Sequence, residues 1–174
     1  MPKENIPKSE YMGMVDFLQK NKLNMFIQNS SIFHAKYVSR KLIESANNEL
    51  NIFSGTLDET FFCSDAILNT LKEKFEKNPS FKINIVVESE IESNILEFKK
   101  KLGDCLFDDG RINVFPRKAH EKITHFMVND TNGIRIEEEH QLGDVQNIRA
   151  KINFNSPRYA TKFWNIFNEL KGIN

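Results

Sequence analysis

The sequence has few cysteines, no excess of charge of either sign and no long apolar run. Its two cysteines, Cys63 and Cys105, lie far apart and outside any CxxC pattern, which is typical of unpaired thiols in a reducing compartment. Lys and Arg number 24, as do Asp and Glu, so the formal net charge is zero. Domains that wrap nucleic acid usually carry a basic excess, so the charge does not support nucleic acid as a partner, although a local basic groove is compatible with it.

The absence of apolar runs bears on localisation. No stretch approaches the roughly 20 apolar residues of a membrane span, and the first residues, MPKENIPKSEYMG, lack the apolar run of a signal peptide. We therefore expect a cytoplasmic protein without a membrane partner. A length of 174 residues suits one core, and we expect a polar arm over residues 1–8 and a single domain over residues 9–174.

What the sequence does contain is an alternation of helix-like and strand-like segments. Helical spacing is found at 9–21, with Met14, Phe17 and Leu18 on one side, and again at 32–48, 65–77 and 90–102. Strand-like runs lie at 23–27, 49–55, 81–88 and 111–116, and three more follow before a last helix that starts at Ser156-Pro157. This order predicts the α/β class, with a mixed, mostly parallel sheet of about six or seven strands flanked by helices.

One segment, HEKITHFMVNDTNG from His120 to Gly133, combines two histidines, a lysine and an aspartate before a turn. Asn-Gly between two strand-like runs predicts a two-residue hairpin in which both turn residues have positive φ. That register would place Asp130 directly opposite Arg135, and His125 on the side of Ile134 and Ile136. Phosphodiesterases with a histidine nucleophile need a lysine beside the imidazole, and residues i and i+2 of a strand share a face.

The segment resembles the motif of the phospholipase D-like superfamily, His-x-Lys-x-x-x-x-Asp. Two alignments can be made. In the first, His120 and Lys122 are the His-x-Lys pair, but Asp130 then follows the lysine by eight residues where the family has five. In the second, Asp130 is the family aspartate, the nucleophile position falls on Ile123 and the lysine position on His125. We favour the second alignment because strand register shifts less readily than loops.

The resemblance covers roughly residues 30 to 172 and implies the fold of one half of a phospholipase D-like protein. Active members use two motif copies, so a homodimer or another protein partner is expected for a chain with one degenerate copy. We expect a non-catalytic, pseudo-enzyme module that acts through protein or ligand binding. The alternative is a metal-independent phosphodiesterase or nuclease that works as a homodimer through His120, Lys122 and Asp130.

Three interpretations of the motif region stay open. Asp130 and Arg135 form an ordinary cross-strand ion pair; or His125, Asp130, Arg135 and Glu137 line a ligand or partner pocket; or His120, Lys122 and Asp130 carry out phosphodiester chemistry.

Other candidate residues have simpler explanations. His34 and Lys36 repeat the His-x-Lys spacing, but within an expected helix, where residues i and i+2 point apart. Asp58 and Glu59 follow an expected strand and are more simply explained as helix-capping residues. The acidic run at 104–109 lacks the spaced oxygen ligands of a calcium loop. We expect no metal and no cofactor.

Overall fold

The structure is a computed structural model that describes residues 8–29, 31–88, 92–117, 124–138 and 149–172. One mixed sheet contains every strand of this part of the chain, in the order β1-β7-β6-β5-β2-β3-β4. The strands are β1 (Ile27–Asn29), β2 (Glu49–Ser54), β3 (Lys82–Val87), β4 (Ile112–Pro116), β5 (Phe126–Asn129), β6 (Ile134–Glu137) and β7 (Ala150–Asn153).

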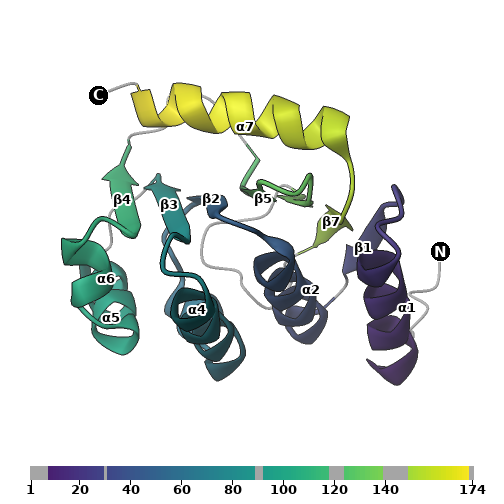
Figure 1. Ribbon diagram of the computed structural model, residues 1–174, viewed down its shortest axis with the longest axis horizontal. Coiled ribbons are helices and arrows are strands. Elements are labelled where there is room, and N and C mark those ends of the chain that lie inside the picture. Colours follow the sequence, from purple (N-terminus) through teal and green to yellow (C-terminus); the bar gives the residue numbers. More distant parts are fainter. Residues whose placement is uncertain (1–7, 30, 89–91, 118–123, 139–148, 173–174) are drawn as a thin grey trace.

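Helices cover both faces of this sheet (Figure 1). The C-terminal helix crosses one face alone, and the other long helices lie side by side on the opposite face. Within the described residues, no helix is long and apolar enough to cross a membrane. The helices are α1 (Lys8–Lys20), α2 (Ile32–Ser45), α3 (Glu59–Phe62), α4 (Asp65–Lys77), α5 (Glu92–Leu102), α6 (Cys105–Asp108) and α7 (Pro157–Gly172).

The predicted α/β class and the seven-stranded mixed sheet are confirmed, and strand direction adds a detail. Strands β2, β3 and β4 are parallel neighbours. Strands β5 and β7 run against their neighbours, so β1 and β6 again point the same way as β2. Five strands therefore share one direction, as a mostly parallel sheet requires, but only two of the six neighbouring pairs are parallel.

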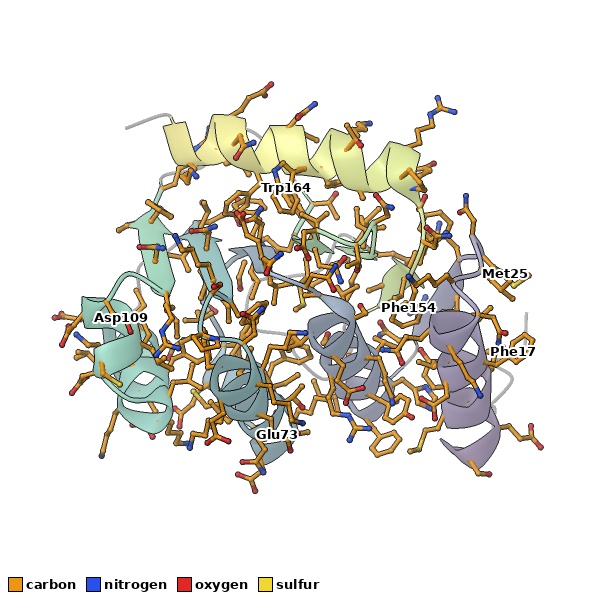
Figure 2. The ribbon with its side chains drawn as sticks, in the orientation of Figure 1. Phe17, Met25, Glu73, Asp109, Phe154 and Trp164 are labelled. Atoms are coloured by element: carbon orange, nitrogen blue, oxygen red, sulfur yellow. The ribbon has the colours of Figure 1, made fainter. Side chains whose placement is uncertain are left out.

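The core consists of two apolar layers, one on each face of the sheet. The larger layer joins α1, α2, α4 and α5 to side chains such as Leu50, Ile85 and Met127. The smaller layer lies under α7, where Phe126 and Phe167 pack together. Figure 2 shows Trp164 between α7 and the sheet. The last five residues of β3 are all buried in this arrangement, because both faces of a central strand are covered.

Helix α1 buries a different side from the one that we expected. Tyr11, Val15 and Leu18 are buried, whereas Met14 and Phe17 are exposed. Two of the three side chains expected in the core therefore face outward. The side of α1 that carries Tyr11 faces the core because the ring of Tyr11 stacks on His34 of α2, with ring centroids 3.8 Å apart. The polar hydroxyl of Tyr11 does not prevent this packing.

Candidate functional site

The motif region forms a hairpin of β5 and β6, but its register differs from the expected one. Met127 lies opposite Arg135, and Val128 lies opposite Ile134. The connection is one residue longer than a two-residue turn, because the Asn129 N–H donates to the carbonyl of Gly133 at 3.0 Å. The expectation that Asp130 lies opposite Arg135 is wrong, and the shift moves Arg135 to the face that carries Met127.

The side chain of Asn129 explains the longer turn. Its Oδ1 accepts hydrogen bonds from the backbone N–H groups of Thr131 and Gly133, at 3.1 and 2.8 Å. Its Nδ2 donates to the carbonyl of Leu42 and to Ser45 of α2, both at 2.9 Å. Only Asn132 of the Asn-Gly pair has positive φ. A buried side chain tied to a distant helix therefore sets the turn geometry.

Asp130 lies at the amino end of β2, on the edge of the sheet away from His125. Its carboxylate accepts hydrogen bonds from the backbone N–H groups of Asn47 and Asn48, at 2.8 and 2.7 Å. Asp130 follows His125 by five positions along the nearly extended chain of β5, a distance of about 16 Å. The structure therefore separates Asp130 from the other three residues of the expected pocket, and its role here is to hold the chain between α2 and β2.

His125, Arg135 and Glu137 do come together, at the edge formed by the carboxyl ends of β2 and β3. Ligand crevices of open α/β sheets are commonly found at such edges. His125 Nε2 lies 2.7 Å from Glu88 Oε2, and its Nδ1 lies 3.5 Å from Glu137 Oε2. Phe53 also contacts the imidazole, edge to face, with centroids 5.4 Å apart. The ring is thus held between two carboxylates at the start of β5.

The surroundings of His125 favour its protonated form. Burial alone lowers the pKa of the imidazole, but hydrogen bonds and charge attraction from Glu137 and Glu88 outweigh burial and raise the pKa above its ordinary value. A protonated ring can donate from both nitrogens, which is what two flanking carboxylates require.

Arg135 is the most deeply buried charged group near this edge, with 1% of its surface exposed. Its Nη1 donates to Glu137 Oε1 at 2.5 Å, and its guanidinium lies over the ring of Phe61 of α3, 5.4 Å from the centroid. Glu137 therefore connects Arg135 and His125 on one face of the sheet. Among the described residues, no hydrogen-bond partner is found for Nε or Nη2 of Arg135.

Some of the expected site residues lie outside the described part of the chain. These are His120 and Lys122 of the first alignment, and Ile123, which occupies the nucleophile position of the second. In the described residues, no group of three His, Cys, Asp or Glu side chains is arranged to hold a metal ion.

The remaining candidate residues take part in ring packing, helix capping or ion pairs. His34 and Lys36 lie in α2, where the His34 ring is buried against Tyr11. The Asp58 carboxylate caps α3 by accepting from the N–H of Phe61 at 3.2 Å. Lys99 Nζ lies 3.9 Å from Asp104 Oδ1 and 3.8 Å from Asp108 Oδ1. Both cysteines are free thiols, and burial raises the pKa of Cys63 to about 11.

Sequence reasoning missed Glu88, Tyr11 and Phe61. Glu88 comes directly after the carboxyl end of β3, and Asp58 comes shortly after the carboxyl end of β2. Asp58 was a candidate because loops at the carboxyl ends of strands often line ligand crevices, and the same reasoning could have found Glu88. Tyr11 and Phe61 carry no such signal, since their spacing is that of ordinary core residues.

Comparison with known proteins gives the fold. No protein-family model and no curated protein matches the sequence. TrmBL2, an archaeal chromatin protein with a novel mode of DNA binding, is 14% identical, with a TM-score of 0.58 over 93% of this chain and 58% of that chain. Nuc of Salmonella typhimurium, a phospholipase D family member, is 12% identical, with a TM-score of 0.58 over 83% of this chain and 92% of that chain.

Phosphatidylserine synthase of Haemophilus influenzae Rd KW20 is 11% identical, with a TM-score of 0.59 over 96% of this chain and 46% of that chain. This chain therefore spans little more than half of TrmBL2 and less than half of the synthase. The fold is the phospholipase D-like α/β fold, as the resemblance implied.

Proposed function

We propose that this chain is a non-catalytic phospholipase D-like module that acts by binding a ligand or a protein partner. One observation carries the proposal: the imidazole of His125, which stands at the lysine position of the motif, is held between the carboxylates of Glu88 and Glu137. A phosphate-binding lysine must be able to turn its charge toward the substrate. His125 is instead paired with protein carboxylates.

Charge supports the same proposal. Among the described residues, the ion pairs of the cluster around His125 join two carboxylates, Glu88 and Glu137, to two bases, His125 and Arg135. Their charges sum to zero when His125 is protonated, and to minus one when it is not. A phosphodiester is an anion, and the carboxylates that flank His125 would repel it. The nucleophile position also carries isoleucine, which cannot attack phosphorus.

The alternative is a phosphodiesterase that uses His120 and Lys122. The fold shared with Nuc is the observation in its favour. Against it, the carboxylate of Asp130 already accepts two backbone hydrogen bonds at the other edge of the sheet.

A hydrolysis assay separates the two functions. The full chain is incubated in EDTA with bis-p-nitrophenyl phosphate and with DNA, beside an active phospholipase D-like nuclease as the positive control. We expect no product above the protein-free blank. Cleavage that persists in EDTA and is abolished by His120→Ala would overturn the proposal and establish the enzyme.

We further propose that a second copy of the chain is one partner of this module. Exposed apolar side chains lie at one end of the molecule, on α1 and on the chain that leads to β1: Phe17 is 60% exposed and Met25 56% (Figure 2). Phe26 continues this apolar patch to Tyr159 of α7, with ring centroids 5.2 Å apart. A formal net charge of zero gives little repulsion between copies.

A further inference from the structure

Strand β4 forms one edge of the sheet, so within the described residues its backbone is paired on one side only (Figure 1). The N–H of Ile83 donates to the carbonyl of Arg111, and the N–H of Arg117 donates to the carbonyl of Val87, both at 2.8 Å. In a parallel pair, alternate residues of one strand bond to the same neighbour. The backbone groups of the residues in between therefore face the free edge, and these residues are Ile112, Val114 and Pro116.

This free edge is open at Val114. Ile112 is only 2% exposed, whereas Val114 is partly exposed and Pro116 is exposed. Pro116 has no N–H, as is usual for a proline in an edge strand. Val114 therefore offers both an N–H and a carbonyl, and neither has a hydrogen-bond partner in the described part of the chain. The strand also has no charged side chain, which is a common means of preventing an edge from pairing.

A row of asparagine side chains ends at the same edge. Asn51, Asn84 and Asn113 lie side by side on β2, β3 and β4. Asn84 Nδ2 donates to Asn51 Oδ1 at 2.9 Å, and Asn113 Nδ2 donates to Asn84 Oδ1 at 3.2 Å. Among the described residues, no donor is found for the Oδ1 of Asn113. An amide on one further strand would continue the row in the same way.

Two bases flank the open part of the edge. Arg117 directly follows Pro116, and Lys171 of α7 lies over Phe115, with Nζ 6.0 Å from the ring centroid. Phe115 and Arg117 alternate to the face that α7 covers, so both charges lie on one face. Neither base forms an ion pair within the residues that the structure describes. A carboxylate on a strand beside β4 would complement this charge.

We propose that the edge of β4 binds an extended segment of another protein, which pairs with Val114. An asparagine of that segment continues the row beyond Asn113, and a carboxylate faces Lys171 and Arg117. This inference rests on the proposed function, because it names the partner of the binding module. The occupant is not a second copy, since that contact is assigned to the apolar patch around Phe17, at the opposite end of the sheet. Self-complementary contacts at both ends of one sheet would join copies into an open-ended chain.

The probe for this edge is the end-capped peptide Glu-Val-Asn-Val-Glu, which presents the same side chains in either strand direction. We expect it to shift the NMR signal of the Val114 N–H in the full chain and to slow hydrogen exchange there, because that N–H gains a carbonyl partner. Lys-Val-Asn-Val-Lys reverses the charge of the peptide, and Glu-Val-Leu-Val-Glu lacks the amide. Both should bind more weakly than the first peptide.

Two variants of the chain test the same contacts. Val114→Pro removes the outward N–H but leaves the bonds to β3, and should weaken peptide binding about tenfold or more. Lys171→Gln should weaken it about twofold to fivefold, because an exposed ion pair contributes little. Lys162→Gln is the matched control, since Lys162 lies on the same helix but farther from β4, and this variant should bind as the wild type does.

The proposal is wrong if the Val114 signal does not respond to the first peptide, or if the two peptides of opposite charge bind equally. It is also wrong if the Val114 signal of the free chain changes with protein concentration and still does so in Phe17→Glu, because a second copy would then occupy the edge. If Val114→Pro does not fold, the three peptides decide on the wild-type chain. All these results leave the non-catalytic assignment intact, because only the hydrolysis assay tests it.

Discussion

At the scale of single residues, the turn after β5 shows where local sequence rules fail. The Asn132-Gly133 pair correctly predicted a hairpin between two strands. It did not predict the register, because the turn depends on Asn129, whose partners Leu42 and Ser45 belong to a helix more than 80 positions earlier. Gly133 is required for space, since a Cβ there would lie 2.6 Å from Leu42 Cδ1 and 2.9 Å from the Asn129 amide.

Gly133→Ala tests this interpretation. We expect the free energy of unfolding to fall by about 1–3 kcal/mol, because α2 or Asn129 must shift to admit a methyl group. Urea denaturation followed by circular dichroism measures the change. Gly13→Ala is the control, since nothing lies within 4 Å of a Cβ at that exposed position of α1. The control should gain up to about 1 kcal/mol from helix propensity. Equal stabilities of the two variants would contradict the packing role of Gly133.

At the scale of elements, the strands were predictable but their pairing was only partly so. The alternation of strands and helices up to Pro116 correctly indicated the parallel neighbours β2, β3 and β4. Nothing local indicated that β5 pairs with β2, because such a contact joins segments far apart in the chain. That pairing brings the start of β5 to the carboxyl ends of β2 and β3, so His125 meets Glu88. The cluster around His125 therefore followed from the sheet order, which the sequence pattern did not specify.

His125 links three strands through ionisable partners, which makes its titration a test of their arrangement. The raised pKa means that the folded state holds the proton more tightly than the unfolded state. This stability is fully present below the ordinary histidine pKa of about 6.5, and is lost as pH rises through the higher pKa of the folded state. NMR titration of the imidazole should show the pKa falling in Glu88→Gln and in Glu137→Gln.

The control for this titration is Glu73→Gln, on the exposed surface of α4 (Figure 2). It should leave the pKa of His125 unchanged. A wild-type pKa at or below the ordinary value would contradict the cluster described for the edge of the sheet.

At the scale of the whole molecule, the layers agree with the apolar stripes of most helices. Helix α7 buries Ala160, Phe167 and Leu170, whereas Tyr159, on the same apolar stripe, is 43% exposed. Helix α1 does not follow its most apolar side, and Phe17 is left outside. Composition could not show this, because an exposed phenylalanine and a buried one contribute equally to an apolar count. An uncovered apolar surface of this kind is typical of an interface.

Self-association is the corresponding prediction. Light scattering after size exclusion should give a mass near twice 20.3 kDa at high concentration. Phe17→Glu should shift the protein toward the monomer, because a carboxylate would have to be buried in the contact. Leu96→Glu is the matched control, since Leu96 of α5 is 56% exposed and lies at the other end of the sheet. A monomeric wild type, or equal effects of both variants, would contradict an interface on α1.

Strand β5 has only four residues, yet its two ends serve separate purposes. Asn129 and Asp130 at one end fasten the hairpin to α2 and to the chain that enters β2. His125 precedes the other end, where its partners are the side chains of Glu88 and Glu137. Alleles altered at the first end should therefore lower how much protein accumulates in a cell, while those altered at the second should change what normal amounts of protein recognise. Two distinct phenotypes would thus map within six consecutive codons.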